Sequence, residues 1–311
     1  MRQSWLSPVA EFVRIPTAFG WRSEFSRIPL RAIAAAVAFS LCTSLWAADE
    51  PASRLHLAWA DEWLTIRAAH LPGGEVRVHY LEAFCRSGST DRDWKETVIP
   101  HRTALKSNSA AGDRISLRST LDDGVIVDHE ITARRIDSDG DEVDFRLTAS
   151  NPTDKPSDAQ WAQPCVRVDK FTGHGQADYL PFCFIYLAGK QARLPTKPWA
   201  ETARYVPGQV YCPLSVSRND VNPRPLSSLV PSNGLIGCYS DDGKQILATA
   251  WEPYQELFQG VGVCIHSDFR IGGLKPKETK TIRGKLYLTA ADGPKLLERY
   301  RADFPEQYAK R

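Results

Sequence analysis

Short runs of alternating hydrophobic and polar residues make up most of the chain, and turn-forming residues separate them. Alternation places the two kinds of side chain on opposite faces of a β-strand. Asp-Gly pairs between such runs predict tight hairpins, because glycine accepts the positive φ that these turns need. Three such pairs lie at 123–124, 139–140 and 242–243, and Pro72-Gly73-Gly74 marks a fourth turn. The pattern predicts an antiparallel meander that folds into a large β-sandwich.

Two regions depart from this strand pattern. Residues 187–234 contain seven prolines between Pro195 and Pro231, and proline cannot donate a hydrogen bond to a strand ladder. We expect this region to form an ordered, loop-rich lid and one wall of a cleft. Near the C-terminus, Asp292 precedes Pro294 and a run of apolar residues at helical spacing, which predicts a short helix over residues 292–305.

The N-terminal region predicts export. Residues 1–31 carry five arginines and two glutamates, and an apolar run follows from Ala32 to Ala48. A basic segment, an apolar segment too short for a membrane span and a small-residue end are typical of a secretory signal peptide. We expect residues 1–47 to be this signal peptide, or alternatively an uncleaved anchor. Residues 48–311 are then a single periplasmic or extracellular domain without a stable membrane span.

Charge and cysteine content limit the partners. The leader carries more positive charge than the whole chain, whose net charge is +2, so the remainder is nearly neutral. It has no basic stripe, and we expect no nucleic-acid partner. Six cysteines remain, and they can form disulfides or stay as buried thiols. No Cys or His pair has the loop spacing of a zinc site, although Cys264 and His266 are close on one strand. The sequence thus predicts neither a metal nor a cofactor.

The strand-like segment around His266 is the main candidate site. Its alternation puts His266, Asp268 and Arg270 on one face and sends Ile265 and Phe269 into a core. An imidazole and carboxylates can share general acid and base roles, and an arginine can hold a hydroxyl or carboxylate group. The alternative is a solvated polar sheet face without chemistry.

The hairpin arm before this segment adds Trp251, Glu252 and Glu256 to the candidates. If these side chains face the same way as His266, they supply carboxylates and an aromatic surface to the same site. A catalytic role for His266 depends on that shared orientation.

Other candidates lie on separate segments. Trp161 and Arg167 alternate with apolar residues on one strand-like run. An indole can cover the apolar face of a sugar ring while polar side chains bind its hydroxyl groups. Trp161 as a core side chain is the alternative. His174 lies in a turn between two glycines, and Arg204 lies in the proline-rich region.

Several familiar catalytic motifs are missing from the chain. It has no Gly-x-Ser-x-Gly elbow, phosphate-binding glycine loop, dinucleotide fingerprint or His-Glu-x-x-His pattern. Serine hydrolases, nucleotide enzymes and common metallopeptidases are therefore disfavoured.

The strands from Trp251 to Leu288 resemble the closing strands of galactose-mutarotase-like supersandwich proteins. The resemblance rests on the segment 264–270 and on Leu-Lys-Pro-Lys-Glu-Thr at 274–279. The stretch from Ala60 to Thr153 is similar to the first half of such a sheet. The chain after the leader also resembles exported, functionally unassigned proteins of planctomycete-type bacteria.

This resemblance implies an all-β fold, a large antiparallel two-sheet supersandwich with a concave carbohydrate-binding surface. Aldose epimerases of the superfamily use a histidine acid and a glutamate base. By role, this implies His266 or His174 as acid and Glu252 or Glu256 as base. The candidate substrate-binding residues, taken from the sequence pattern itself, are Trp161, Arg167, Arg204, Trp251, Asp268 and Arg270.

The function implied is that of an exported protein that recognises a carbohydrate or another polyhydroxy ligand, with epimerase-like or lyase-like chemistry. A non-catalytic carbohydrate-binding module and a structural protein of the cell envelope are the alternatives. The superfamily includes catalytic and non-catalytic members, so the resemblance leaves these possibilities open.

Overall fold

The computed structural model describes residues 55–137, 140–196, 209–223, 225–260 and 262–307. The expected signal peptide and Arg204 lie outside these residues.

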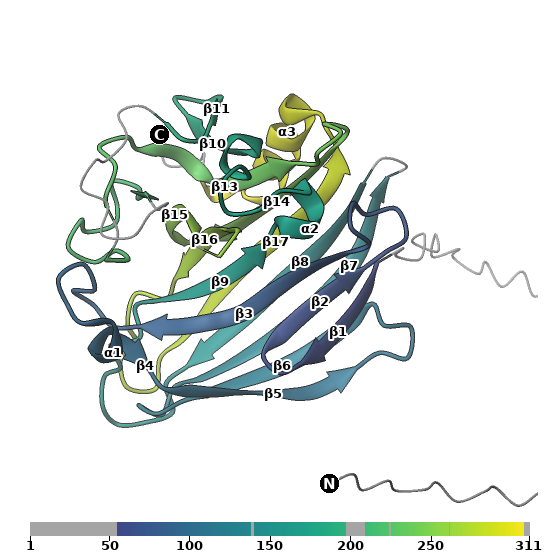
Figure 1. The fold of residues 1–311 in the computed structure, drawn as a ribbon. Helices are drawn as coiled ribbons and strands as arrows, with labels where there is room; N and C mark the ends of the chain where they lie inside the picture. The colour runs from purple at the N-terminus through teal and green to yellow at the C-terminus, as the bar shows by residue number, and fades with distance from the viewer. Residues whose placement is uncertain (1–54, 138–139, 197–208, 224, 261, 308–311) are drawn as a thin grey trace, which may run out of the picture. The chain divides into compact units, whose positions relative to one another are not determined.

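Two antiparallel sheets lie face to face (Figure 1). The first has the order β1-β2-β3-β9-β16-β15-β12, with β4 beside β3, and the second has the order β11-β10-β13-β14-β17-β8-β7-β6-β5. The prediction of an all-β, antiparallel two-sheet sandwich is confirmed. The first sheet consists of β1 (His56–Ala60), β2 (Trp63–Arg67), β3 (Glu75–Cys85), β4 (Val98–Ile99), β9 (Trp161–Arg167), β12 (Val210–Tyr211), β15 (Tyr254–Gly260) and β16 (Cys264–Arg270). The second consists of β5 (His101–Asn108), β6 (Arg114–Leu121), β7 (Ile126–Asp137), β8 (Gly140–Ser150), β10 (Cys183–Leu187), β11 (Lys190–Arg193), β13 (Pro231–Tyr239), β14 (Gln245–Glu252) and β17 (Thr279–Ala290).

Glycines with positive φ allow the tight turns of the hairpins in this sandwich. The turn between β6 and β7 has Gly124 at φ 93°, and the turn between β13 and β14 has Gly243 at φ 68°. Both values lie in the left-handed region that favours glycine. Strands β2 and β3 pair across the Pro-Gly-Gly turn, as predicted.

The main core lies between the two sheets. Ile265 and Phe269 on β16 are fully buried in it, which confirms the alternation predicted for this strand. Trp251 on β14 lies between Phe145 of β8 and Phe269, with ring centroids 5.2 and 4.8 Å apart. Aromatic contacts therefore join the two sheets at the centre of the sandwich.

A second apolar cluster forms where α3 (Gly293–Asp303) packs on the outer face of the second sheet, against β10, β14 and β17. Asp292 caps this helix by accepting a hydrogen bond from the Lys295 backbone N–H at 2.9 Å. Leu296 and Tyr300 fill the contact, as the helical spacing predicts. The other helices are α1 (Trp94–Thr97) and α2 (Asp169–Thr172), and 3-10 turns span Leu180–Phe182 and Pro305–Gln307. Among the described residues, no helix has the length and apolar character needed to cross a membrane.

Residues 209–223 of the proline-rich region, which we call the covering segment, lie on the outer face of the first sheet, whereas β11 and the start of β13 belong to the second sheet. Strand β12 pairs with β15, and Val210, Val216 and Val221 pack against Phe258. Asn222 donates its backbone N–H to the Glu256 carboxylate at 2.9 Å. The outer face of β15 around Glu256 is therefore buried under this segment and is not the solvated surface considered from the sequence.

One histidine is buried between the sheets. His129 on β7 forms hydrogen bonds with Tyr80 of β3 at 3.1 Å and with Ser119 of β6 at 3.0 Å. Burial outweighs the attraction of nearby Asp128 and lowers the pKa of His129 to about 3. The ring is therefore neutral in the folded protein at neutral and mildly acidic pH.

This buried histidine predicts a loss of stability in acid. Between about pH 6.5 and pH 3 the unfolded chain binds a proton at His129 that the folded chain does not, so the free energy of unfolding falls as the pH falls. The slope from this one group is about 1.4 kcal/mol per pH unit at most. Urea unfolding at several pH values should show a shallower acid slope for His129→Gln than for wild type. His56→Gln, which changes an exposed histidine, is the matched control, and an acid slope for His129→Gln equal to that of wild type would refute the prediction.

Candidate functional site

Four neighbouring strands of the first sheet, β3, β9, β16 and β15, build the candidate site on their outer face. His79 lies opposite Cys165, and Phe258 lies opposite His266. Since Ile265 pairs with Val166, His266 also lies opposite Cys165. One row of side chains therefore crosses the four strands in the order His79, Cys165, His266, Phe258.

A second row of polar side chains runs beside the first. Gln163 lies opposite Ala83, and Glu256 lies opposite Asp268. The register of β9 and β16 places Gln163 opposite Asp268 as well. The structure therefore brings together three candidates from the sequence, His266, Asp268 and Glu256.

His266 is held between a thiol and a carboxylate. Its Nε2 atom lies 3.2 Å from Cys264 Sγ, and its Nδ1 atom lies 3.4 Å from Asp268 Oδ1. The ring also stacks on Phe258 with centroids 4.0 Å apart. Both ring nitrogens thus face groups of the protein, and 1% of His266 is exposed.

Electrostatics favour a thiolate beside an imidazolium in this cluster. The hydrogen bond with Cys165 and the nearby His266 hold the pKa of Cys264 well below its usual range, against the effect of burial. Burial acts to lower the pKa of His266, but Cys264 and Asp268 outweigh it and raise that pKa to about 10. The hydrogen bond with Cys264 and burial raise the pKa of Cys165.

The two carboxyl groups of the second row are also perturbed. Burial raises the pKa of Asp268 to about 6 although His266 opposes the shift. Burial, and then the charge of Asp268, raise the pKa of Glu256 well above its usual range. Negative charge is therefore costly at this end of the cluster.

Two adjoining pockets open over these strands. The first, which we call the cysteine pocket, has a volume of about 210 Å³ and is lined by His79, Glu82, Gln163, Cys165, Cys264 and His266. The second, the arginine pocket, also has a volume of about 210 Å³ and is lined by Glu75, Arg77, Asp169, Lys170 and Val263. Trp63, Arg167 and Gly262 line both.

Local backbone features shape the cysteine pocket. Leu81 has φ 62°, and the register of β3 against β9 shifts between His79 and Ala83. Such a bulge changes the direction of the neighbouring side chains, and Glu82 reaches Gln163 Nε2 at 3.4 Å. Glu82 is thus a pocket residue that the sequence analysis missed.

Cations surround the indole in the wall shared by the two pockets. The Arg77 guanidinium lies 4.2 Å from the centre of the Trp63 ring and that of Arg167 lies 5.8 Å from it. The ring also stacks on His79 at 4.9 Å. Arg167 donates a hydrogen bond to the Gly262 carbonyl. Arg167 is a candidate from the sequence that the structure does place at a pocket.

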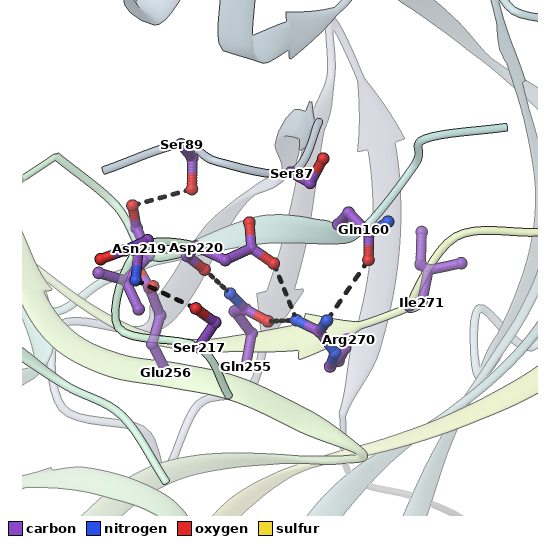
Figure 2. A network of polar contacts seen from close by, with 12 residues as sticks. Ser87, Ser89, Gln160, Ser217, Asn219, Asp220, Gln255, Glu256, Arg270 and Ile271 are labelled. Carbon is purple, nitrogen blue, oxygen red and sulfur yellow. Dashed lines mark hydrogen bonds and ion pairs between the residues drawn. The ribbon is translucent and has the colours of Figure 1, made fainter. Parts of the chain in front are cut away.

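Arg270 contacts protein groups on several sides (Figure 2). Its guanidinium donates to Gln255 at 2.6 Å, to Asp220 at 3.2 Å and to Gln160 at 3.4 Å. Asp220 belongs to the segment that covers the sheet, and its backbone carbonyl accepts a further hydrogen bond from Gln255. Arg270 therefore fastens the covering segment and does not line either pocket.

The structure places the remaining candidates away from the cluster. Trp161 and Trp251 are fully buried, so neither indole offers a face to a ligand. Glu252 is on β14 in the second sheet and accepts a hydrogen bond from Gln307. His174 lies after α2 between Asp241, at 3.0 Å, and Asp178, at 3.3 Å. Arg204 lies outside the described residues.

No family model matches the chain, and no curated protein matches it.

Proposed function

We propose that this chain is an exported protein that binds a small acidic sugar, of the uronic acid kind, across the cysteine and arginine pockets. The observation that carries the proposal is Arg167, which lines both pockets. Arginine binds carboxylates through paired, charge-assisted hydrogen bonds. The basic and apolar character of residues 1–48 supports export.

The size and lining of the pockets suit this ligand. Each is smaller than the ~300–1,000 Å³ typical of sites for drug-sized molecules, which favours a ligand of one or two sugar rings. Glu82 and Gln163 offer acceptors and donors for hydroxyl groups. Arg77 and Lys170 add positive charge in the arginine pocket.

The geometry favours binding over acid–base catalysis. A general acid or base needs a free nitrogen or oxygen within hydrogen-bond reach of the substrate. Both nitrogens of His266 face protein groups, and Glu256 is buried beneath Asn222. His174 and Glu252 line neither pocket. We therefore propose a binding protein ahead of an epimerase-like or lyase-like enzyme.

Calorimetric titration with galacturonate and galactose tests the proposal. Wild type should bind galacturonate more tightly than galactose. Because a hydrogen bond to a charged group contributes about 1.5–3 kcal/mol, Arg167→Ala should weaken galacturonate binding roughly ten- to hundredfold. Arg146→Ala is the matched control, because Arg146 lies on β8 with its side chain 66% exposed. Equal affinity for the acid and the neutral sugar, or equal losses in the two variants, would contradict the proposal.

A further inference from the structure

Two thiols and one imidazole meet on the outer face of the first sheet although they come from distant parts of the chain. Cys165 lies on β9, and Cys264 and His266 lie on β16. Their two Sγ atoms and one imidazole nitrogen lie within 4.8 Å of one another. With Zn–S bonds of about 2.3 Å and Zn–N bonds of about 2.0 Å, ligand atoms around a tetrahedral ion are roughly 3.5–3.8 Å apart. Shifts of about 1 Å at most would complete this geometry.

An outer-shell group is already in place behind the imidazole. A metal-binding histidine usually donates its other ring N–H to a carboxylate, which fixes the ring and strengthens the ligand. Asp268 Oδ1 lies 3.4 Å from His266 Nδ1, on the side away from Cys264. Asp268 is fully buried, and neither of its oxygens has a hydrogen-bond partner among the described residues. A buried carboxylate is costly unless a charged or donor group faces it, and a metal-bound imidazole would keep its Nδ1–H directed at Asp268.

The remaining coordination position would face a pocket. Cys165, Cys264 and His266 all line the cysteine pocket, together with Glu82 and Gln163. Zinc bound by two cysteines and one histidine, with a fourth position for water or a ligand, is a known arrangement of open zinc sites. Imidazole and thiolate are both preferred ligands of zinc.

We propose that Cys165, Cys264 and His266 bind one Zn²⁺ ion, with Asp268 as the outer-shell partner of His266 and a fourth position open to the cysteine pocket. The zinc site does not require the proposed sugar ligand, so an experiment can reject either proposal without rejecting the other. A disulfide between Cys165 and Cys264 is the competing state of the same two sulfur atoms.

Metal analysis and cobalt spectroscopy of the full chain test the site. The protein is purified under a reducing agent, stripped with a chelator and titrated with Zn²⁺ or Co²⁺. We expect one ion per chain, and Co²⁺ should give thiolate charge-transfer absorption together with the visible bands of a tetrahedral site. Cys165→Ala and Cys264→Ala should each lose stoichiometric binding and part of the charge-transfer absorption.

The second sheet offers a matched cysteine control. Cys183 on β10 lies directly opposite Cys238 on β13, and both are buried, but neither belongs to a group of three metal-ligating side chains among the described residues. Cys183→Ala should therefore keep one zinc ion per chain. Asp268→Asn should keep the stoichiometry but weaken zinc binding roughly 10–100-fold, as expected for an outer-shell partner.

The zinc and cobalt titrations distinguish a zinc site from a disulfide and from a site for another metal. One zinc per chain that depends on Cys165 and Cys264 but not on Cys183 supports the site. If a cysteine variant does not fold, the cobalt spectrum of wild type still reports whether thiolates coordinate the ion. The proposal is overturned if the reduced wild-type protein binds no zinc, if Co²⁺ shows no thiolate absorption, if Cu⁺ binds where Zn²⁺ does not, or if the two cysteines form a disulfide even in the presence of Zn²⁺.

Discussion

Trp251→Ala should lower the free energy of unfolding by about 3–5 kcal/mol, the usual range for removing a large aromatic side chain from a core. The indole packs between Phe145 and Phe269 and so contacts both sheets. Gly284 of β17 lies directly against the ring, where any larger residue would collide with it. The cavity left by alanine would lie between these rigid strands, which cannot close it.

Two further variants test whether the loss of stability comes from the buried position of Trp251. Trp251→Phe keeps most of the aromatic volume and removes an indole N–H without a hydrogen-bond partner among the described residues, so its loss should be clearly smaller. Trp94→Ala changes a tryptophan that is 37% exposed and should cost less than about 1 kcal/mol. Denaturant unfolding measures all three. If Trp251 were a sugar platform, Trp251→Ala would keep wild-type stability and lose ligand binding.

Local patterns predict several of the strands of this fold, although β11 and β12 lie in the region that was expected to be loop. The alternation around His266 correctly places Ile265 and Phe269 in the core, because side-chain direction along a strand depends only on position. The Asp-Gly turns are equally local, since two residues determine the reversal of the chain. The C-terminal helix follows from its cap and its apolar spacing.

The site depends on contacts that no local pattern specifies. Cys165 meets Cys264 and His266 only because β9 and β16 are neighbours in the first sheet. The loop-spacing rule for zinc sites therefore missed a group whose third member comes from another strand. Likewise, alternation shows which side chains of a strand share a face, but it does not show whether other parts of the chain cover that face. The burial of Trp161 therefore could not be deduced from the sequence.

The covering segment is the largest difference between expectation and structure. The proline content of residues 187–234 indicates loop structure, and the described part does contain only short strands before β13. However, proline content says nothing about which surface a loop covers. Val221 and Asn222 lie over β15 and bury Glu256. Glu256 and Arg270 therefore contact the covering segment, where the sequence pattern alone suggested that they would face solvent or a ligand.

Arg270→Leu should destabilise the fold by about 3 kcal/mol, because Asp220 would keep a largely buried carboxylate without its cation. The side chain of Asp220 is 9% exposed and that of Arg270 is 27% exposed, so water replaces the lost contacts poorly. Gln255 would lose a partner at 2.6 Å as well. The loss should be local at first, with faster hydrogen exchange in the covering segment around Asp220.

A double-mutant cycle distinguishes an Arg270 that holds the covering segment through Asp220 from an Arg270 that binds a ligand. Asp220→Asn removes the buried charge, so Arg270→Leu in that background should cost less, with a coupling energy of about 0.5–3 kcal/mol. Arg118→Leu, which breaks an exposed pair with Asp128, should leave stability close to wild type. Urea unfolding of the four cycle proteins gives the coupling. Additive losses would contradict the contact between Arg270 and Asp220 as a stabilising pair. An Arg270→Leu protein that keeps its stability and loses only affinity for galacturonate would show that Arg270 serves the ligand instead. The expected coupling follows because a single guanidinium joins β16 and β15 to Asp220 of the segment that covers Glu256, so removing it loosens this segment from the sheet.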